Sequence, residues 1–434
     1  MKIHALGFIL CALALPAIPV SAASDKPNIV LIVADDLGYA DLGVHGCKDI
    51  ATPHMDSIAN AGVRLTDAYV TAPVCAPSRA GLLTGRWQDR FGFEGNPEPG
   101  AKWGLPLTEK TIAERLKAMG YATGIFGKWH QGETPEFHPN KRGFDEFFGF
   151  LSGMHSYFEG NDPKWGPILR GNEPVQLDKY LTQAIAEESV GFIDRHKGHP
   201  FFLYAAFNAP HTPVEAPQSY LDEVAGIQDP ARRKYAAMVR ALDDGVGTIL
   251  EAIAKNGLEK NTVVIFLSDN GGPILEGAAV NGSSNAPLRG GKAEVWEGGI
   301  RIPFFVRWPG HLSAGKVLNN PVISLDILPT ALALAGGSQD PALDGADILP
   351  WLEGKASAPA RTPFFWKFYA QVAVRDGDSK LVRPNAGKPM ELYDLKNDVS
   401  ESSNLADGDQ DRVKSLKKKF DEWNSGNGKP LNTR

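Results

Sequence analysis

Apolar runs and helical patterns alternate along most of this chain. Residues 28–33 form a continuous, mostly β-branched run, which is typical of a strand buried on both faces of a parallel sheet. Three later runs have the same character: residues 121–126, 201–206 and 262–267. Helical spacing of apolar residues fills the intervals, most clearly over residues 177–196 and 235–253. Strands that alternate with helices predict an α/β domain.

One of the helices is marked at both ends. Thr111 and Glu114 have the spacing of a capping box, in which each side chain bonds to the backbone of the other residue. Ile112, Leu116 and Met119 follow at helical spacing, and Gly120 ends the pattern. The sequence therefore predicts a short helix between the first two strands.

Polar side chains follow each of the four predicted strands. Asp35, Lys128, His211 and Asp269 all lie just beyond an apolar run. In open α/β sheets, ligands bind at the carboxyl ends of the strands. We therefore expect these four positions to converge on one site.

The pattern weakens after about residue 345. Residues 350–363 are rich in Ala, Pro, Gly and Ser and are typical of a linker. Short strands are predicted over residues 364–369, 372–375 and 392–395, and an amphipathic helix over residues 409–423. The sequence thus predicts a main domain over residues 24–350 and a small α+β subdomain over residues 351–434.

The N-terminus has the layout of a secretory signal peptide over residues 1–23. A short polar start precedes an apolar run that Pro16 breaks, and small residues follow. The run is short for a bilayer span, so a retained anchor is the weaker alternative. A lipoprotein anchor at Cys11 is disfavoured because Leu10 stands where a small residue is wanted. We expect the mature protein to be exported, periplasmic or secreted, with no membrane attachment after cleavage.

Composition narrows the possible partners. With 43% hydrophobic and 22% charged residues, the 434-residue chain is globular and has a substantial core. A net charge of −6 argues against nucleic acid as a ligand. Three cysteines are too few for a disulfide framework. Once exported, Cys47 and Cys75 either form one disulfide, or one of them is kept for chemistry.

Two pairs of oxygen ligands indicate a metal site. The adjacent carboxylates Asp35 and Asp36 need a cation or protons to compensate their charge. Asp269 and Asn270 hold the same position after another strand. Carboxylate and amide oxygens suit Ca²⁺ or Mg²⁺, and no cysteine or histidine cluster competes for a softer metal. Either pair alone could instead be a helix cap or a simple turn.

The segment from Cys75 to Arg79 reads CAPSR, and residues 80–86 read AGLLTGR. A lone cysteine is usually a small buried hydrophobe or half of a disulfide. These two segments together, however, resemble the type I sulfatase signature, C-x-P-S-R followed by a segment similar to G-x-L-T-G-R. In that family the cysteine is oxidised to Cα-formylglycine before the chain folds.

The resemblance extends from about residue 27 to residue 309, with a family-like ending at residues 391–405. The further matching segments are residues 28–38, 127–130, 211–213, 268–271 and 288–301. Residues 127–150 resemble the N-acetylgalactosamine-6-sulfatase and arylsulfatase branch. The resemblance implies a large, central, mixed but mostly parallel sheet flanked by helices, of the alkaline phosphatase type.

The resemblance also implies a Ca²⁺ site. Its ligands would be Asp35, Asp36, Asp269 and Asn270, with the modified Cys75 completing the set. The hydrated aldehyde of Cys75 would be a geminal diol, one hydroxyl of which attacks sulfur. Calcium would lower the pKa of that hydroxyl, and Asp269 is placed to accept its proton.

Roles for the remaining residues follow from the same resemblance. Lys128 and Lys292 would stabilise charge on the transferring sulfate, and Arg79 would hold the modified residue. His211, with Lys292, would protonate the departing sugar oxygen. His130 would take the proton of the second hydroxyl, so that sulfate is expelled and the aldehyde regenerated. Taken singly, such lysines and histidines are often surface or loop residues.

The sequence thus predicts a sulfatase that acts on a sulfated carbohydrate and is matured by a formylglycine-generating enzyme. One alternative is a related formylglycine enzyme that cleaves phosphodiesters or phosphonate monoesters. A zinc phosphatase is disfavoured, because Cys75 replaces its Ser/Thr nucleophile and its histidine-rich ligand set is missing. A catalytically silent glycan-binding homologue is the alternative from another class. His155, Lys141 and Arg142 are candidates for sugar contacts, or else ordinary loop residues.

Overall fold

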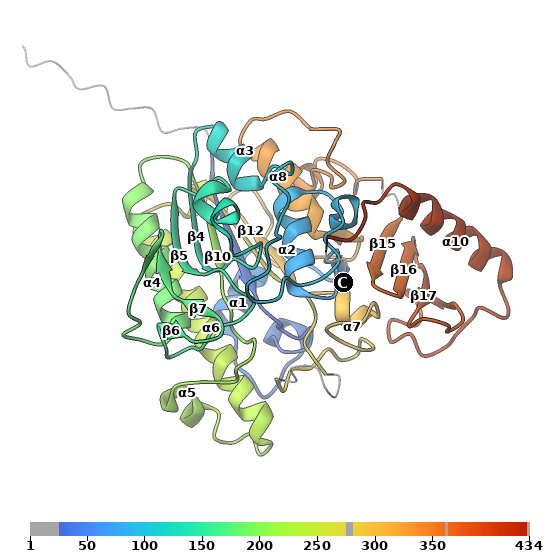
Figure 1. Ribbon diagram of the computed structural model, residues 1–434, viewed down its shortest axis with the longest axis horizontal. Helices are drawn as coiled ribbons and strands as arrows, with labels where there is room; N and C mark the ends of the chain where they lie inside the picture. The colour runs from blue at the N-terminus through green and yellow to red at the C-terminus, as the bar shows by residue number, and fades with distance from the viewer. Residues whose placement is uncertain (1–25, 275–280, 361–362, 432–434) are drawn as a thin grey trace, which may run out of the picture.

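The computed structural model describes residues 26–274, 281–360 and 363–431 (Figure 1). The predicted signal peptide, residues 1–23, lies outside these ranges. Within them, no helix combines the length and apolar character needed to cross a membrane.

A ten-stranded mixed sheet forms the centre of the main domain. Its strand order is β13 (Lys316–Leu318), β2 (Val63–Leu65), β12 (Phe304–Arg307), β11 (Thr262–Ser268), β1 (Asn28–Ala34), β10 (Phe201–Ala206), β4 (Ala122–Lys128), β5 (Glu146–Phe150), β8 (Leu169–Arg170) and β9 (Glu173–Pro174). The five central strands from β11 to β5 are parallel, whereas β12 and β8 run antiparallel to their neighbours among them. The predicted α/β architecture is therefore confirmed.

Each face of the sheet is covered by its own set of helices. Alternate residues of β1 point to opposite faces, so that Val30 and Ile32 join one core and Leu31 and Val33 the other. The helices of the first face are α1 (Pro53–Asn60), α4 (Leu181–His196) and α6 (Pro230–Lys255). Those of the second are α2 (Cys75–Thr84), α3 (Ile112–Ala118) and α8 (Ile327–Leu334). Burial on both faces explains why β1 is an unbroken apolar run.

The strands predicted around residues 28–33, 121–126, 201–206 and 262–267 are β1, β4, β10 and β11. The capping box of α3 is confirmed, since Thr111 Oγ1 accepts the N–H of Glu114 and the Glu114 carboxylate accepts that of Thr111. The helix predicted from residue 177 begins later, at Leu181.

The C-terminal part forms a separate four-stranded antiparallel sheet, which Figure 1 shows beside the main domain together with α10. Its elements are β15 (Phe364–Phe368), β16 (Gln371–Asp376), β17 (Ser379–Arg383), β18 (Glu391–Asp394) and α10 (Gln410–Ser425). Strand β17 was not predicted.

The predicted linker over residues 350–363 is wrong at its start. Residues Leu349–Leu352 form α9, with Pro350 in its first turn. Trp351 and Leu352 are buried in the core of the main domain. A composition rich in Pro and Ala concealed a short helix that is fixed by two large apolar side chains.

Apart from short 3-10 helices, the remaining elements are β3 (Ala68–Tyr69), which pairs with β14 (Val322–Ile323), the hairpin β6 (Asn161–Asp162) and β7 (Gly166–Pro167), and the helices α5 (Gln218–Glu223) and α7 (Glu297–Ile300).

Candidate active site

The candidate residues gather at the carboxyl edge of four neighbouring strands. β11, β1, β10 and β4 lie side by side and in parallel, so the residues after them meet at one edge. Gly127 permits the close approach of β4 to β10, because it has a φ of +115° and a Cβ there would lie 2.0 Å from the Ala206 carbonyl oxygen. The expected convergence of the four strand ends is therefore observed.

Cys75 is the first residue of α2, which is buried along its whole length. The thiol Sγ donates a hydrogen bond to Asp35 Oδ1 at 3.3 Å, and Cys75 is only 1% exposed. Burial, and next the charge of Asp35, raises the pKa of the Cys75 thiol well above its usual range. Both Cys47 and Cys75 are free, so the alternative of a disulfide between them is wrong.

Two lysines neutralise the adjacent carboxylates. Lys128 Nζ donates to Asp35 Oδ2 at 2.5 Å, and Lys292 Nζ to Asp36 Oδ2 at 2.7 Å. Burial acts to raise the pKa of Asp35, but the surrounding cations, Lys128 foremost, outweigh it and hold that pKa far below its usual range. Burial acts to lower the pKa of Lys292, and the charge of Asp36 more than reverses this effect.

Arg79 links three of the four strand ends. Its Nε donates to Asp269 Oδ2 at 2.8 Å, its Nη1 donates to the Lys128 carbonyl at 3.2 Å, and its Nη2 lies 3.8 Å from Asp35 Oδ2. Burial, and next the charge of Asp35, raises the pKa of Asp269 to about 7. The hydrogen bonds of Arg79 thus go to groups around Cys75 rather than to Cys75 itself.

The two candidate histidines, His130 and His211, are both buried. His211 Nδ1 is 2.6 Å from the Thr212 carbonyl oxygen, and because a carbonyl only accepts, Nδ1 carries the proton. Its Nε2 lies 3.5 Å from Asp36 Oδ2. Burial, followed by the charge of Lys292, lowers the pKa of His211 to about 4. His130 has a φ of +54°, its Nδ1 has no hydrogen-bond partner, and burial lowers its pKa well below the usual value.

The cluster fits a cation. Ligand atoms of Asp35, Asp36, Cys75 and His211 all lie within 4.8 Å of one another. Asn270 Oδ1 is buried without a hydrogen-bond partner, which is the state of an amide oxygen able to serve as a ligand. The predicted ligand set consists of oxygen donors and Cys75, and the fold also brings a ring nitrogen of His211 into this group. Asp269 is outside the group of four.

The loop candidates for sugar contacts have structural partners. Arg142 is 1% exposed and donates to the carbonyls of Leu105 and Glu109. His155 is fully buried between the carbonyls of Ser156 and Gly166. For these two residues the expectation of a direct sugar contact is therefore wrong. Lys141 is exposed, and nothing in the structure assigns it a role.

Two residues near the site escaped the sequence analysis. Tyr157 donates through its hydroxyl to the carbonyls of Asn208 and His211 and thereby fixes the loop after β10. Gln371, on the C-terminal sheet, donates to the Ala293 carbonyl and accepts the N–H of Val295. No local motif marks either residue, since both act through backbone groups that are distant in the sequence.

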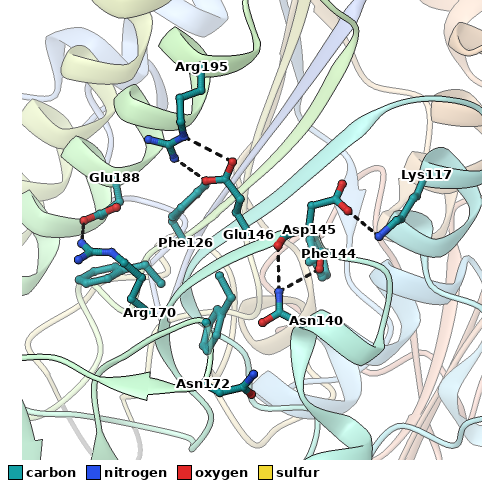
Figure 2. A pocket seen from close by; sticks show the side chains of 13 residues that line it. Lys117, Phe126, Asn140, Phe144, Asp145, Glu146, Arg170, Asn172, Glu188 and Arg195 are labelled. Carbon is teal, nitrogen blue, oxygen red and sulfur yellow. Dashed lines mark hydrogen bonds and ion pairs between the residues drawn. The ribbon is translucent and has the colours of Figure 1, made fainter.

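A separate cavity of about 580 Å³ lies away from this cluster, by the start of β5 (Figure 2). Three ion pairs line it: Lys117–Asp145, Arg170–Glu188 and Arg195–Glu146. None of the predicted catalytic residues contributes to it. Because its cations are already paired with carboxylates, it offers no free positive charge to an anionic substrate.

Comparison with known proteins agrees with this geometry. The Sulfatase family model matches residues 27–338, and the model for the C-terminal part of N-sulphoglucosamine sulphohydrolase matches residues 291–425. N-acetylgalactosamine-6-sulfatase from Sus scrofa is 36% identical over 86% of this chain and 74% of its own length. Arylsulfatase A from Homo sapiens is 36% identical over 89% of this chain and 85% of its own length.

A solved structure of Ps i-CgsB in complex with k-i-k-neocarrahexaose has a TM-score of 0.88 and 38% identity, covering 94% of each chain. The PsFucS1 sulfatase from Pseudoalteromonas sp. has a TM-score of 0.82 and 27% identity, over 94% of this chain and 92% of its own. The matched segments include Cys75 and all four strand ends, so the chain belongs to the sulfatase family and is a sulfuric ester hydrolase.

Proposed function

We propose that this chain is a calcium-dependent sulfatase of a sulfated carbohydrate, acting through a formylglycine made from Cys75. The observation that carries the proposal is the buried position of Cys75 at the N-terminus of α2, beside Asp35, whose carboxylate is paired with Lys128. The CAPSR segment that begins at Cys75 supports the modification. The formylglycine, when present, would supply the hydroxyl nucleophile of a hydrated aldehyde.

The proposed calcium ligands are Asp35, Asp36, Asp269 and Asn270, together with the modified Cys75. The unpartnered Oδ1 of Asn270 and the adjacent carboxylates support this assignment. The ion would lower the pKa of the attacking hydroxyl and offset charge on a sulfate oxygen. Arg79 donates from Nε to Asp269 Oδ2 and so helps to fix the orientation of that carboxylate.

Lys128 and Lys292 are the proposed sulfate-binding donors. Each ammonium already lies within hydrogen-bond distance of a carboxylate in the cluster and has further N–H groups to offer. Charge-assisted hydrogen bonds from these lysines would stabilise the charge that develops on the sulfate oxygens.

The histidines are proposed to move the protons. Since Nδ1 of His211 keeps its proton for the Thr212 carbonyl, Nε2 would have to take up a proton first and then pass it to the departing sugar oxygen. His130 has an unpartnered Nδ1 and would accept the proton of the second hydroxyl. The two histidines would thus serve the two halves of the reaction separately.

The carbohydrate substrate is supported by relatives. The Ps i-CgsB structure contains k-i-k-neocarrahexaose, and other relatives are named N-acetylgalactosamine-6-sulfatase. We further propose export after removal of residues 1–23, maturation by a formylglycine-generating enzyme, and the division into residues 24–350 and 351–434. In this proposal the mature chain has no membrane attachment.

The test is sulfate release from a panel of sulfated glycans. The protein is co-expressed with a formylglycine-generating enzyme, and mass spectrometry measures the conversion of Cys75. The wild type and a Cys47→Ala control should release sulfate, and Cys75→Ala should not. Full conversion of Cys75 with hydrolysis of phosphodiesters but no sulfate esters would favour the phosphodiesterase alternative. An unconverted Cys75 in active protein would contradict the proposed nucleophile.

A further inference from the structure

The β6–β7 hairpin presents two adjacent side chains in a fixed conformation. Lys164 and Trp165 lie in its turn, between β6 and β7. Asp162 Oδ1 accepts the backbone N–H of Lys164 at 2.8 Å and that of Trp165 at 3.0 Å. This Asx-type turn holds the backbone of both residues in place.

Buried polar side chains attach the hairpin to the loop after β5. Ser152, only 2% exposed, donates from Oγ to the Trp165 carbonyl at 2.8 Å. The ring Nε2 of the buried His155 lies 2.9 Å from the Gly166 carbonyl oxygen. Because buried hydrogen bonds are costly to break, the hairpin is held at a defined place relative to residues 152–155.

The same loop contacts both candidate catalytic histidines. The backbone N–H of His130 donates to the Leu151 carbonyl at 3.0 Å. Gly153 packs so closely against the His130 ring that a Cβ there would lie 2.7 Å from Nε2. Further along the loop, Tyr157 donates to the His211 carbonyl. Trp165 is therefore one hydrogen bond from the segment that packs against His130.

Lys164 is an exposed cation without a carboxylate partner within the described ranges. Its Nζ lies 4.5 Å from the centroid of the Trp165 ring, a distance typical of a cation–π contact. The three cations of the cavity in Figure 2 are, in contrast, all paired with carboxylates. The charge of Lys164 thus remains available to an external anion.

We propose that Lys164 and Trp165 form a substrate subsite for a second sulfate group of the glycan. The inference rests on the proposed function, because the first sulfate would occupy the buried cluster at Cys75. The partly exposed indole offers an apolar surface to a sugar ring, and the ammonium beside it offers a charge-assisted bond to a sulfate on that ring. The preferred substrate is then a glycan with more than one sulfate.

The experiment compares two oligosaccharides that are identical except for one additional sulfate. Steady-state kinetics of sulfate release are measured for the wild type, Lys164→Ala, Lys164→Arg and Trp165→Ala. Lys260→Ala is the matched control. This exposed lysine precedes β11 and therefore lies at the amino ends of the strands, away from the carboxyl edge that holds the site. We expect Lys164→Ala to raise KM about tenfold for the doubly sulfated glycan, with kcat within twofold and no change for the singly sulfated one. Lys164→Arg should largely retain the wild-type KM.

Calorimetric binding with the Cys75→Ala protein separates this proposal from the proposed function. Addition of Lys164→Ala to Cys75→Ala should weaken binding of the doubly sulfated glycan, even if no glycan is turned over. If the wild type releases no sulfate from either glycan but the two Cys75→Ala proteins still differ in affinity, the proposed function alone would be overturned. Equal affinities of the two proteins, or a wild-type KM that does not depend on the second sulfate, would overturn the subsite.

Discussion

Asp89 is a buried acid whose protonation should make stability depend on pH. It is fully buried, Gln88 donates to its Oδ2, and its Oδ1 has no hydrogen-bond partner. Burial, and next the nearby charge of Glu94, raises the pKa of Asp89 to about 8. In the unfolded chain the same carboxyl ionises near pH 3.9, as is usual for aspartate.

The direction of the effect follows from the two pKa values of Asp89. Between about pH 4 and pH 8 the unfolded chain has released this proton, whereas the folded chain still holds it. The contribution of Asp89 to the free energy of unfolding is therefore fully present below pH 4 and is lost as the pH rises through 8. Each pH unit in this interval costs the wild type about 1.4 kcal/mol relative to a chain with a neutral residue there. Between pH 4 and pH 7 the difference amounts to about 4 kcal/mol.

The measurement is urea unfolding of the wild type and Asp89→Asn at intervals from pH 4.5 to pH 8. The free energy of unfolding of Asp89→Asn should rise steadily relative to that of the wild type as the pH rises, with the m value unchanged. Asp411→Asn is the control, because the Asp411 side chain is 98% exposed and its substitution should leave the pH dependence unchanged. Parallel stability curves for Asp89→Asn and the wild type would refute the argument, because they would mean that Asp89 is ionised in the folded protein.

Three further predictions concern a buried ion-pair cluster, a side chain that bonds to the backbone beside Lys292, and the proposed metal. Lys380→Met should lower the free energy of unfolding, measured by urea titration, by roughly 3–5 kcal/mol, because it removes the cation 2.9 Å from buried Glu297 and 2.8 Å from buried Glu401. A loss below about 1 kcal/mol would contradict this prediction. Gln371→Ala should reduce kcat/KM for sulfate release about tenfold with little change in the unfolding midpoint, because two hydrogen bonds to the backbone beside Lys292 are lost. Unchanged kinetics would show that the loop around Lys292 keeps its conformation without these two bonds. Chelation of divalent cations should abolish sulfate release, and added Ca²⁺ should restore it; full activity after exhaustive chelation would rule out the proposed metal.

The sequence predicted the parts of the site that follow buried strands. Asp35, Lys128 and Asp269 could be placed at one edge because each comes directly after an apolar run, and parallel strands share their carboxyl edge. The contact between Arg79 and Asp269 could not be predicted, since these residues are 190 positions apart and meet only through packing of α2 on the sheet. Gln371 was missed for the same reason.

The C-terminal part was predicted less completely because composition gives weak information there. The residues of α9 resemble a linker by their Pro and Ala content, and only the burial of Trp351 reveals a helix. Strand β17 reads SKLVR, which is too short and too polar to stand out from a loop. Its place in the sheet comes from pairing with β16 and β18.

The charge balance of the cluster is consistent with an anionic substrate. Three carboxylates face three cations, all of them buried except the partly exposed Lys292: Asp35, Asp36 and Asp269 against Arg79, Lys128 and Lys292. Both histidines are neutral near pH 7, as their lowered pKa values indicate, so the six groups sum to zero when all of them are ionised. Asp269, whose pKa is raised to about 7, reaches that state fully only above this pH or beside a bound cation. A divalent cation would leave the cluster with a net charge of +2, and a buried charge of that size needs compensation by an anion. A sulfate ester carries one negative charge, whereas the released sulfate carries two and a proton is released with it. The site would therefore reach charge neutrality once that proton has left it.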